Sequence, residues 1–300
     1  MMPLRSQLLA ALMLAPILSP ALAAGVPPAE RSAPIPPVDS GPPIAVVPAS
    51  DLAGRPVLDR RGERAGRLAH ILVDPATGRI RYAMIGDVPS GSFASGDAVP
   101  VVPWARLGPI PQAHAFRLDL DRSALLEAPR IHGFASAIRP EVAAQILDFA
   151  AASGGSEPPP TLQRDLPPPP DALRLPSNPA TPETVGPPVL VSANALAGVS
   201  VATQDGRPLG EIAEVLLDTA SRQVAYVLVA EGGLRAPKAW LPVPVQILVP
   251  SPRGYSLAVE TFWLRQVPPL QRPEPPSRIG SAWLAALYRN YGIEPYWRPG

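Results

Sequence analysis

One feature constrains the fold of this chain more than any other: part of its sequence occurs twice. Leu52-Ala53-Gly54 recurs as Leu196-Ala197-Gly198, 144 positions later. The same spacing relates five further pairs: Val57 to Val201, Gly62 to Gly206, Gly66 to Gly210, Asp74 to Asp218 and Tyr82 to Tyr226. Beyond them the register drifts by a few residues, so that Phe116-Arg117-Leu118 matches Tyr255-Ser256-Leu257. The repeat predicts two copies of one structural module.

Each copy has the pattern of antiparallel β-structure. Residues 67–73 place Leu68, His70 and Leu72 on one face, and residues 79–85 place Ile80, Tyr82 and Met84 on one face. The connection Asp74-Pro75-Ala76-Thr77-Gly78 has the residues of a tight turn. Residues 211–217 and 223–229 repeat the hairpin, and several short strands at close spacing predict a small barrel or sandwich.

Proline divides the chain into these modules and the segments between them. Of 300 residues, 45 are proline, yet 46% are hydrophobic and 17% charged, so compact pieces separated by proline-rich spacers are expected. We predict a signal peptide at 1–24, a proline-rich tether at 25–48, a first module with a C-terminal helix at 49–153, a linker at 154–188, a second module at 189–262 and a tail at 263–300.

The N-terminal residues have the features of an export signal. Arg5 supplies a positive charge, an apolar core follows, and Ala21-Leu22-Ala23 forms a small-x-small cleavage site. We predict cleavage near Ala23 and a periplasmic or secreted bacterial protein. The alternative is a membrane-anchored assembly factor that retains its signal, and only that alternative would involve the membrane.

Composition excludes several classes of chemistry. The 26 basic and 25 acidic residues nearly cancel, which argues against a nucleic-acid partner, and the absence of cysteine excludes disulfides and thiolate chemistry. Arg60, Arg61, Arg64 and Arg67 gather near Asp59 and Glu63, a pattern that favours a solvated turn over a functional cluster.

No recognised catalytic or phosphate-binding motif is present. The three histidines are His70, His114 and His132, and none has a partner at metal-ligand spacing on a helix. His70 with Asp74 is the nearest candidate, but Glu214 stands at the equivalent of His70, which favours a polar strand position and a turn aspartate. We therefore predict no metal, no cofactor and no catalytic residue; the alternative is an envelope hydrolase or metal-dependent enzyme using His70, Asp74 and Glu63.

The first copy resembles the PRC-barrel domain. It has the Leu-x-Gly opening, the glycines at Gly62 and Gly66, the Asp-Pro-x-Thr-Gly turn and a terminal Pro103-Trp104. The second copy is more divergent: it lacks the Pro-Thr-Gly turn and has Val245 where Trp104 would fall. The resemblance implies mainly β structure, with two small antiparallel barrels, and a role in protein–protein contact and assembly rather than in chemistry.

The C-terminal tail concentrates aromatic residues. Residues 281–291 predict a short helix with Ser281 as its N-cap. We predict a protein-partner surface composed of Trp283, Tyr288, Tyr291, Tyr296 and Trp297. The alternative is that the tail covers the thin core of its own module. The chain is thus expected to be a non-enzymatic binding or scaffolding protein of the envelope, with its partner and its oligomeric state left open.

Overall fold

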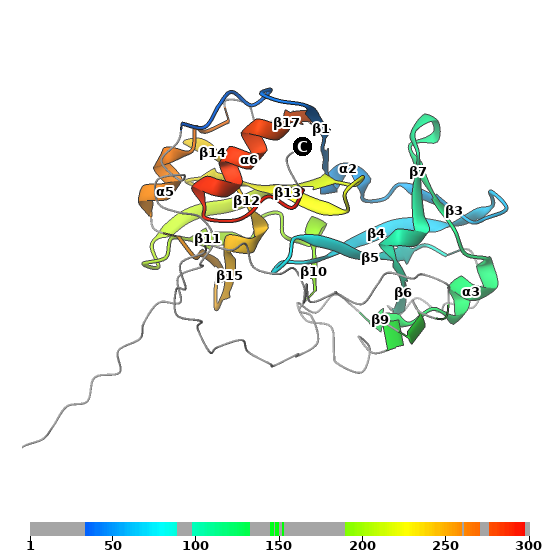
Figure 1. Cartoon of the computed structure of the whole chain (residues 1–300). Coiled ribbons are helices and arrows are strands. Elements are labelled where there is room, and N and C mark those ends of the chain that lie inside the picture. The colour runs from blue at the N-terminus through cyan, green and yellow to red at the C-terminus, as the bar shows by residue number, and fades with distance from the viewer. Residues whose placement is uncertain are drawn as a thin grey trace, which may run out of the picture.

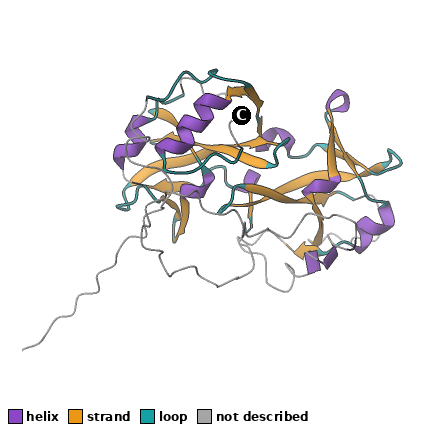
Figure 2. Cartoon of the chain, viewed as in Figure 1, coloured by secondary structure: helices purple, strands orange, loops and turns teal. Residues whose placement is uncertain are grey.

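Strands dominate the structure, as the sequence predicts (Figure 2). The computed structural model describes residues 34–88, 98–132, 145–146, 148–149, 152, 190–259, 261–270 and 276–297. The predicted signal peptide and the predicted linker at 154–188 lie outside these residues. Within them, no helix is both long enough and apolar enough to cross a membrane.

The first copy contains a long central hairpin flanked by short strands. Its strands are β3 (Pro56–Leu58), β4 (Arg64–Asp74), β5 (Arg79–Gly86), β6 (Ala98–Pro103), β7 (Leu107–Ile110), β8 (Ala115–Leu118) and β9 (Arg130–His132). Its helices are α2 (Ala49–Leu52) and α3 (Arg122–Glu127), with 3-10 turns η1 (Trp104–Arg106) and η2 (Pro111–Ala113).

The second copy repeats this order. Its strands are β10 (Val191–Ser192), β11 (Ser200–Ala202), β12 (Pro208–Asp218), β13 (Gln223–Glu231), β14 (Ala239–Val243), β15 (Leu248–Ser251), β16 (Gly254–Leu257) and β17 (Arg278–Gly280). Its helices are α5 (Thr261–Gln266) and α6 (Ser281–Asn290), with 3-10 turns η3 (Ala193–Ala195) and η4 (Val245–Ile247). The long strands β4 and β12 are related by the 144-residue spacing at both ends, so the sequence repeat is also a structural repeat.

Two β-bulges in each central hairpin break the simple alternation predicted for its strands. Between β4 and β5 the register shifts between Leu68 and His70 and again between Leu72 and Val73, and β12 and β13 shift at the equivalent positions. Each extra residue moves the following side chains to the other face. Leu68 therefore packs in the main core while Leu72 packs in a second cluster with Tyr82 and Met84, which corrects the predicted shared face.

The two copies share one sheet through pairs that the repeat relates to each other. Arg79 at the start of β5 lies opposite Gln223 at the start of β13, and these two residues are equivalent in the repeat. The Ile80 amide donates to the Arg222 carbonyl at 2.9 Å, and the equivalent Val224 amide donates to the Gly78 carbonyl at 2.7 Å. The reciprocity of these bonds indicates a local two-fold relation between the copies.

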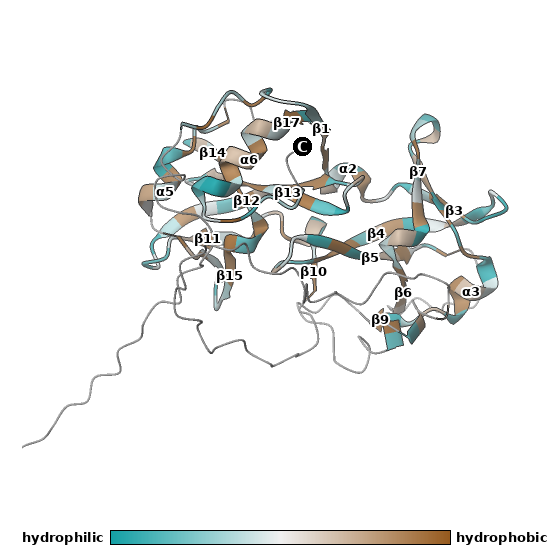
Figure 3. Cartoon of the chain, in the orientation of Figure 1, coloured by the Kyte–Doolittle hydropathy of each residue, from teal (hydrophilic) through white to brown (hydrophobic). Residues whose placement is uncertain are grey.

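In each copy, a short strand that precedes the central hairpin pairs with the long hairpin strand of the other copy. β2 (Val47–Pro48) pairs with β12 through Val47 opposite Leu217, whereas β10 pairs with β4 through Val191 opposite Val73. These are equivalent residues with the copies interchanged. The main hydrophobic core accordingly contains buried residues of both copies. Figure 3 shows hydrophobic stretches along the central strands on both sides of this junction.

The described part of the predicted tether, residues 34–48, contacts the second copy. Within it, β1 (Pro43–Ala45) pairs with β17, and Val46 is buried. Figure 1 shows β1 beside β17 and near α6. The carbonyl of Pro42 accepts from the Ser281 amide at 2.8 Å and that of Ser40 from the Ala282 amide at 3.0 Å. The helix therefore begins at Ser281 with Gly280 as its N-cap, and backbone carbonyls replace the predicted Ser281 cap.

Helical segments cover the outer face of both hairpins. In the first copy, the described residues of the predicted helix within 140–153 are helical, and Ile146 packs with Leu72, Tyr82 and Met84. In the second copy, α6 lies over β13 and β14 (Figure 1). Ten of the described strands form one open path from β15 to β7, while β2, β6, β9, β10 and β14 pair off this path and β1 and β17 form a separate sheet. Pairs that would close either copy into a barrel are not among the described ones.

Candidate functional site

A polar cluster lies where β10 of the second copy meets β4 of the first. His70 Nδ1 is 2.9 Å from Ser192 Oγ, which donates to Asn194 Oδ1 at 3.0 Å. Asn194 also accepts from the Ile71 amide at 3.2 Å and donates to the Ala69 carbonyl at 2.9 Å. These backbone groups belong to the β4 bulge, so Asn194 satisfies from one copy the polar groups that the bulge exposes in the other.

The equivalent junction uses different side chains. Glu214 occupies the place of His70, and its carboxylate accepts from the Val215 amide of its own strand at 2.8 Å. Ser50 of α2, the equivalent of Asn194, donates its hydroxyl to the same carboxylate. Partial burial lowers the pKa of His70 because desolvation disfavours the imidazolium. His70 and Glu214 thus serve the contact between copies, which gives a structural role to the polar strand position predicted from the repeat.

Asp74 and Asp218 have the turn role predicted for them. Asp74 accepts from the Ala76 amide at 3.0 Å and the Thr77 hydroxyl at 2.8 Å. Asp218 accepts from the Ala220 amide at 3.1 Å. The second oxygen of Asp218 also accepts from the Tyr296 hydroxyl at 3.1 Å, which ties the tail to this turn.

The three residues of the alternative metal site are spread along the first copy. Asp74 is four residues from His70 on one strand, a separation of about 13 Å at about 3.3 Å per residue. Glu63 precedes that strand and is exposed. A metal ion needs its ligands at about 2 Å. Among the described residues no three His, Asp or Glu side chains gather closely enough to hold a metal.

The arginine cluster is exposed, as predicted, but only Arg60 and Arg61 lie in a turn, since Arg64 and Arg67 belong to β4. Asp59 accepts from the amides of Arg61 and Glu63, each at 2.9 Å, and so closes the turn. Arg60 donates to Asp119 at 2.8 Å, and this bond lowers the pKa of the Asp119 carboxyl. Because the pair is exposed, its contribution to stability is small.

The aromatic tail packs largely on its own copy. Trp283, Tyr288 and Tyr291 are buried in the main core. The Tyr288 hydroxyl donates to the Val224 carbonyl at 3.1 Å, and that of Tyr291 to the Pro242 carbonyl at 3.2 Å. Tyr296 and Trp297 are half-buried, with ring centroids 4.6 Å apart. Of the predicted partner surface, only these last two side chains offer solvent-accessible area beyond a few per cent.

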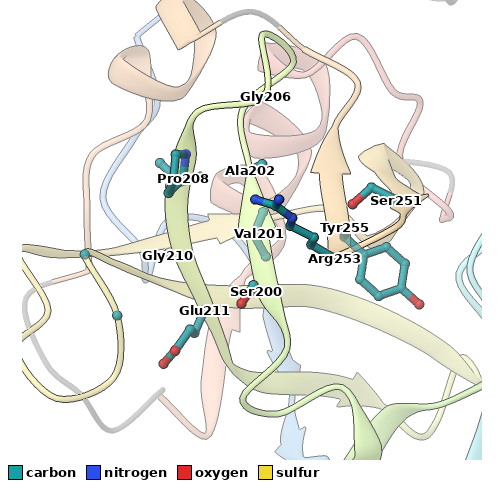
Figure 4. Close-up of a pocket in the computed structure, with 13 residues that line it drawn as sticks. Ser200, Val201, Ala202, Gly206, Pro208, Gly210, Glu211, Ser251, Arg253 and Tyr255 are labelled. Carbon is teal, nitrogen blue, oxygen red and sulfur yellow. The ribbon is translucent and has the colours of Figure 1, made fainter.

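A pocket of about 400 Å³ lies at the far end of the second copy, where β11, β12 and the β15–β16 turn meet. Figure 4 shows the side chains that line it. Its polar lining consists of Ser200, Glu211, Ser251, Arg253 and Tyr255. The remaining lining residues are small or apolar: Val201, Ala202, Gly206, Pro208, Leu209, Gly210, Gly232 and Gly233.

The two charged side chains of the pocket do not pair with each other. Figure 4 shows Arg253 extending across β11, whereas the carboxylate of Glu211 points away from it. Glu211 Oε2 accepts from the Leu234 amide at 3.0 Å. Within the described part of the chain, Arg253 has no hydrogen-bond or ion-pair partner. Lys238, the single lysine of the protein, lies against Gly232 at the pocket wall.

The repeat provides an internal control for these residues. The first copy has Pro56 for Ser200, Arg67 for Glu211 and Phe116 for Tyr255. Gly66 and Gly210 are the same in both copies, because a Cβ at either would overlap a carbonyl of the adjacent strand. The module therefore forms without the polar lining, which is particular to the second copy. The sequence carries no motif for this pocket, and its only signal there is that Ser200, Glu211 and Tyr255 differ from their equivalents in the first copy.

Comparison with known families agrees with the repeat. The sequence model of the PRC-barrel domain matches residues 45–110 and, separately, residues 188–251. The chain thus carries two tandem PRC-barrel domains, and the predicted resemblance is confirmed for both copies. A search of curated proteins finds none that matches this chain.

Proposed function

We propose that this protein is an exported, non-enzymatic binding or scaffolding protein of the bacterial cell envelope that acts through its two PRC-barrel modules, each a small and mainly antiparallel barrel. One strand pair in each copy is parallel, β3 with β8 and β11 with β16, which corrects the wholly antiparallel arrangement expected from sequence. The apolar N-terminal segment with its small-residue cleavage site supports the periplasmic or secreted location. The two family matches support a role in contact and assembly.

The observation that carries the scaffolding role is the reciprocal pairing of these short strands, β2 and β10, with the other copy. It fixes the orientation of the copies, so the protein presents one rigid body with β15 and β16 at one end and β7 and β8 at the other (Figure 1). The ends differ in chemistry: one has the Arg60–Asp119 pair, and the other has the pocket with unpaired charges. A rigid body with two different ends is suited to holding two partners at a fixed separation.

This arrangement also determines how the spacing between the two ends is set. Two independent modules on a proline-rich linker would gain affinity through effective concentration, and linker length would control that gain. Copies that already share a sheet derive their spacing from the junction instead. Changing the length of residues 154–188 should therefore leave partner binding unaltered.

Charge reversal at each end tests the proposal. Arg117 in β8 and Arg253 beside β15 are both exposed, so glutamate at either should leave the fold intact. We expect the purified variants R117E and R253E to lose different proteins in quantitative affinity capture from envelope extracts. Loss of the same proteins by both variants, or full retention by both, would contradict a two-ended scaffold.

The mature N-terminus tests the location separately. Mass spectrometry should find a chain that starts near Ala24 or Gly25. An intact Met1 or Met2 would instead support a membrane-anchored assembly factor.

A further inference from the structure

The pocket of the second copy has a charge arrangement that selects a class of ligand. Glu211 and Arg253 line the same cavity without pairing, and Arg253 has no partner elsewhere among the described residues. Arg253 offers a free guanidinium to an anionic group, and Glu211, whose Oε2 accepts from the Leu234 amide, offers its other carboxylate oxygen to a cationic group. A ligand with both an ammonium and a carboxylate satisfies both.

The remaining lining favours a ligand with small side chains. Gly210, Gly232 and Gly233 leave backbone exposed at the walls, and Ala202 and Ser200 are also small. A volume of about 400 Å³ is at the small end of the range for ligand pockets. Together these features fit the main chain of a short peptide better than an aromatic or branched ligand.

We propose that this pocket binds short peptides with free termini, with Arg253 holding the carboxylate and Glu211 the ammonium. This inference rests on the proposed binding function and names a ligand class for its pocket end. The first copy supports the assignment, since the same module there has Arg67 in place of Glu211 and does not reproduce the pair of opposite charges.

Titration of the purified full-length protein with trialanine, followed by amide NMR, tests the proposal. The amides of Gly210, Gly232 and Gly233 should shift on binding. N-acetylation or C-amidation of the peptide should each weaken binding about tenfold or more, because each removes one charge-assisted contact. Equal binding of free and blocked peptides, or no shifts up to about 10 mM peptide, would overturn it.

Conservative variants identify which side chain binds which terminus of the peptide. In E211Q, acetylation should cost nothing further, and in R253Q amidation should cost nothing further, as a double-mutant cycle requires. Glutamine at 211 keeps an acceptor for the Leu234 amide. R207Q is the matched control, since Arg207 is exposed and paired with Asp205 in the neighbouring turn.

The two proposals can fail independently. If R117E and R253E lose different captured proteins while trialanine does not bind, the scaffold stands and the peptide ligand is wrong. If trialanine binds as described while both charge reversals retain every captured protein, the peptide site stands and the two-ended scaffold is wrong.

Discussion

Replacing Asn194 with alanine should destabilise the whole protein, because its side chain serves the other copy. The substitution removes the acceptor for the Ile71 amide and the donor to the Ala69 carbonyl. A buried polar group without a partner costs about 1–3 kcal/mol. Ile71 is fully buried, while Asn194 and Ala69 are half-buried and admit some water. We expect the free energy of unfolding to fall by about 2–4 kcal/mol in N194A.

The repeat supplies the matched control for this substitution. Ser50 is the equivalent residue, but the bulge amide at its junction, that of Val215, already bonds to Glu214 of the same strand. S50A should therefore cost less than about 1 kcal/mol. Urea unfolding followed by tryptophan fluorescence measures both variants. If N194A and S50A destabilise equally, or N194A costs under about 1 kcal/mol, the argument that Asn194 stabilises the junction is refuted.

Three further predictions concern pH, the linker and the buried hydroxyls. Burial lowers the pKa of His70 below its ordinary 6.5, so on acidification the unfolded chain takes up this proton before the folded chain does. The free energy of unfolding should therefore fall as pH drops below 6.5. In urea titrations at several pH values, H70Q should flatten that slope. Proteolysis at a site inserted within 154–188 should leave two fragments that elute together on gel filtration, because they share a sheet and a core; separate elution would contradict the junction. Tyr226 is buried and its hydroxyl has no hydrogen-bond partner within the described residues, whereas the Tyr288 hydroxyl donates to a carbonyl. In the same denaturation assay, Y226F should be neutral or stabilising, and Y288F should lower the free energy of unfolding by about 1 kcal/mol. The reverse order would be inconsistent with these contacts.

Local features of the fold could be predicted from sequence because neighbouring residues determine them. The Asp74 turn needs an acceptor for nearby amides and a glycine at positive φ, and Gly78 has φ of 72°. The strands on either side follow from the alternation of apolar residues. Two copies follow from the constant spacing, since equivalent residues impose equivalent local structure.

The junction could not be predicted because its partners are far apart in the chain. Val47 and Leu217 are a strand pair, but neither carries a local signal for the other. The bulge beside Ala69 arises from sheet geometry and carries no turn residue, so simple alternation assigned the wrong faces there. The tail illustrates the same limit: aromatic density marks an apolar surface, but whether Trp283 faces a partner or its own core depends on the fold.

Proline in the folded part restricts how the sheet can grow. β7 and β15 end the path of paired strands, and each exposes a proline, Pro109 and Pro250, at the same place in the strand. An edge proline cannot donate a hydrogen bond, so it weakens the strand as a template for another chain. A partner that binds these ends must therefore be held mainly through side chains and loops, and on the second copy those include Glu211 and Arg253. Under the proposed binding function, proline at both sheet edges directs recognition away from the edges and toward the pocket.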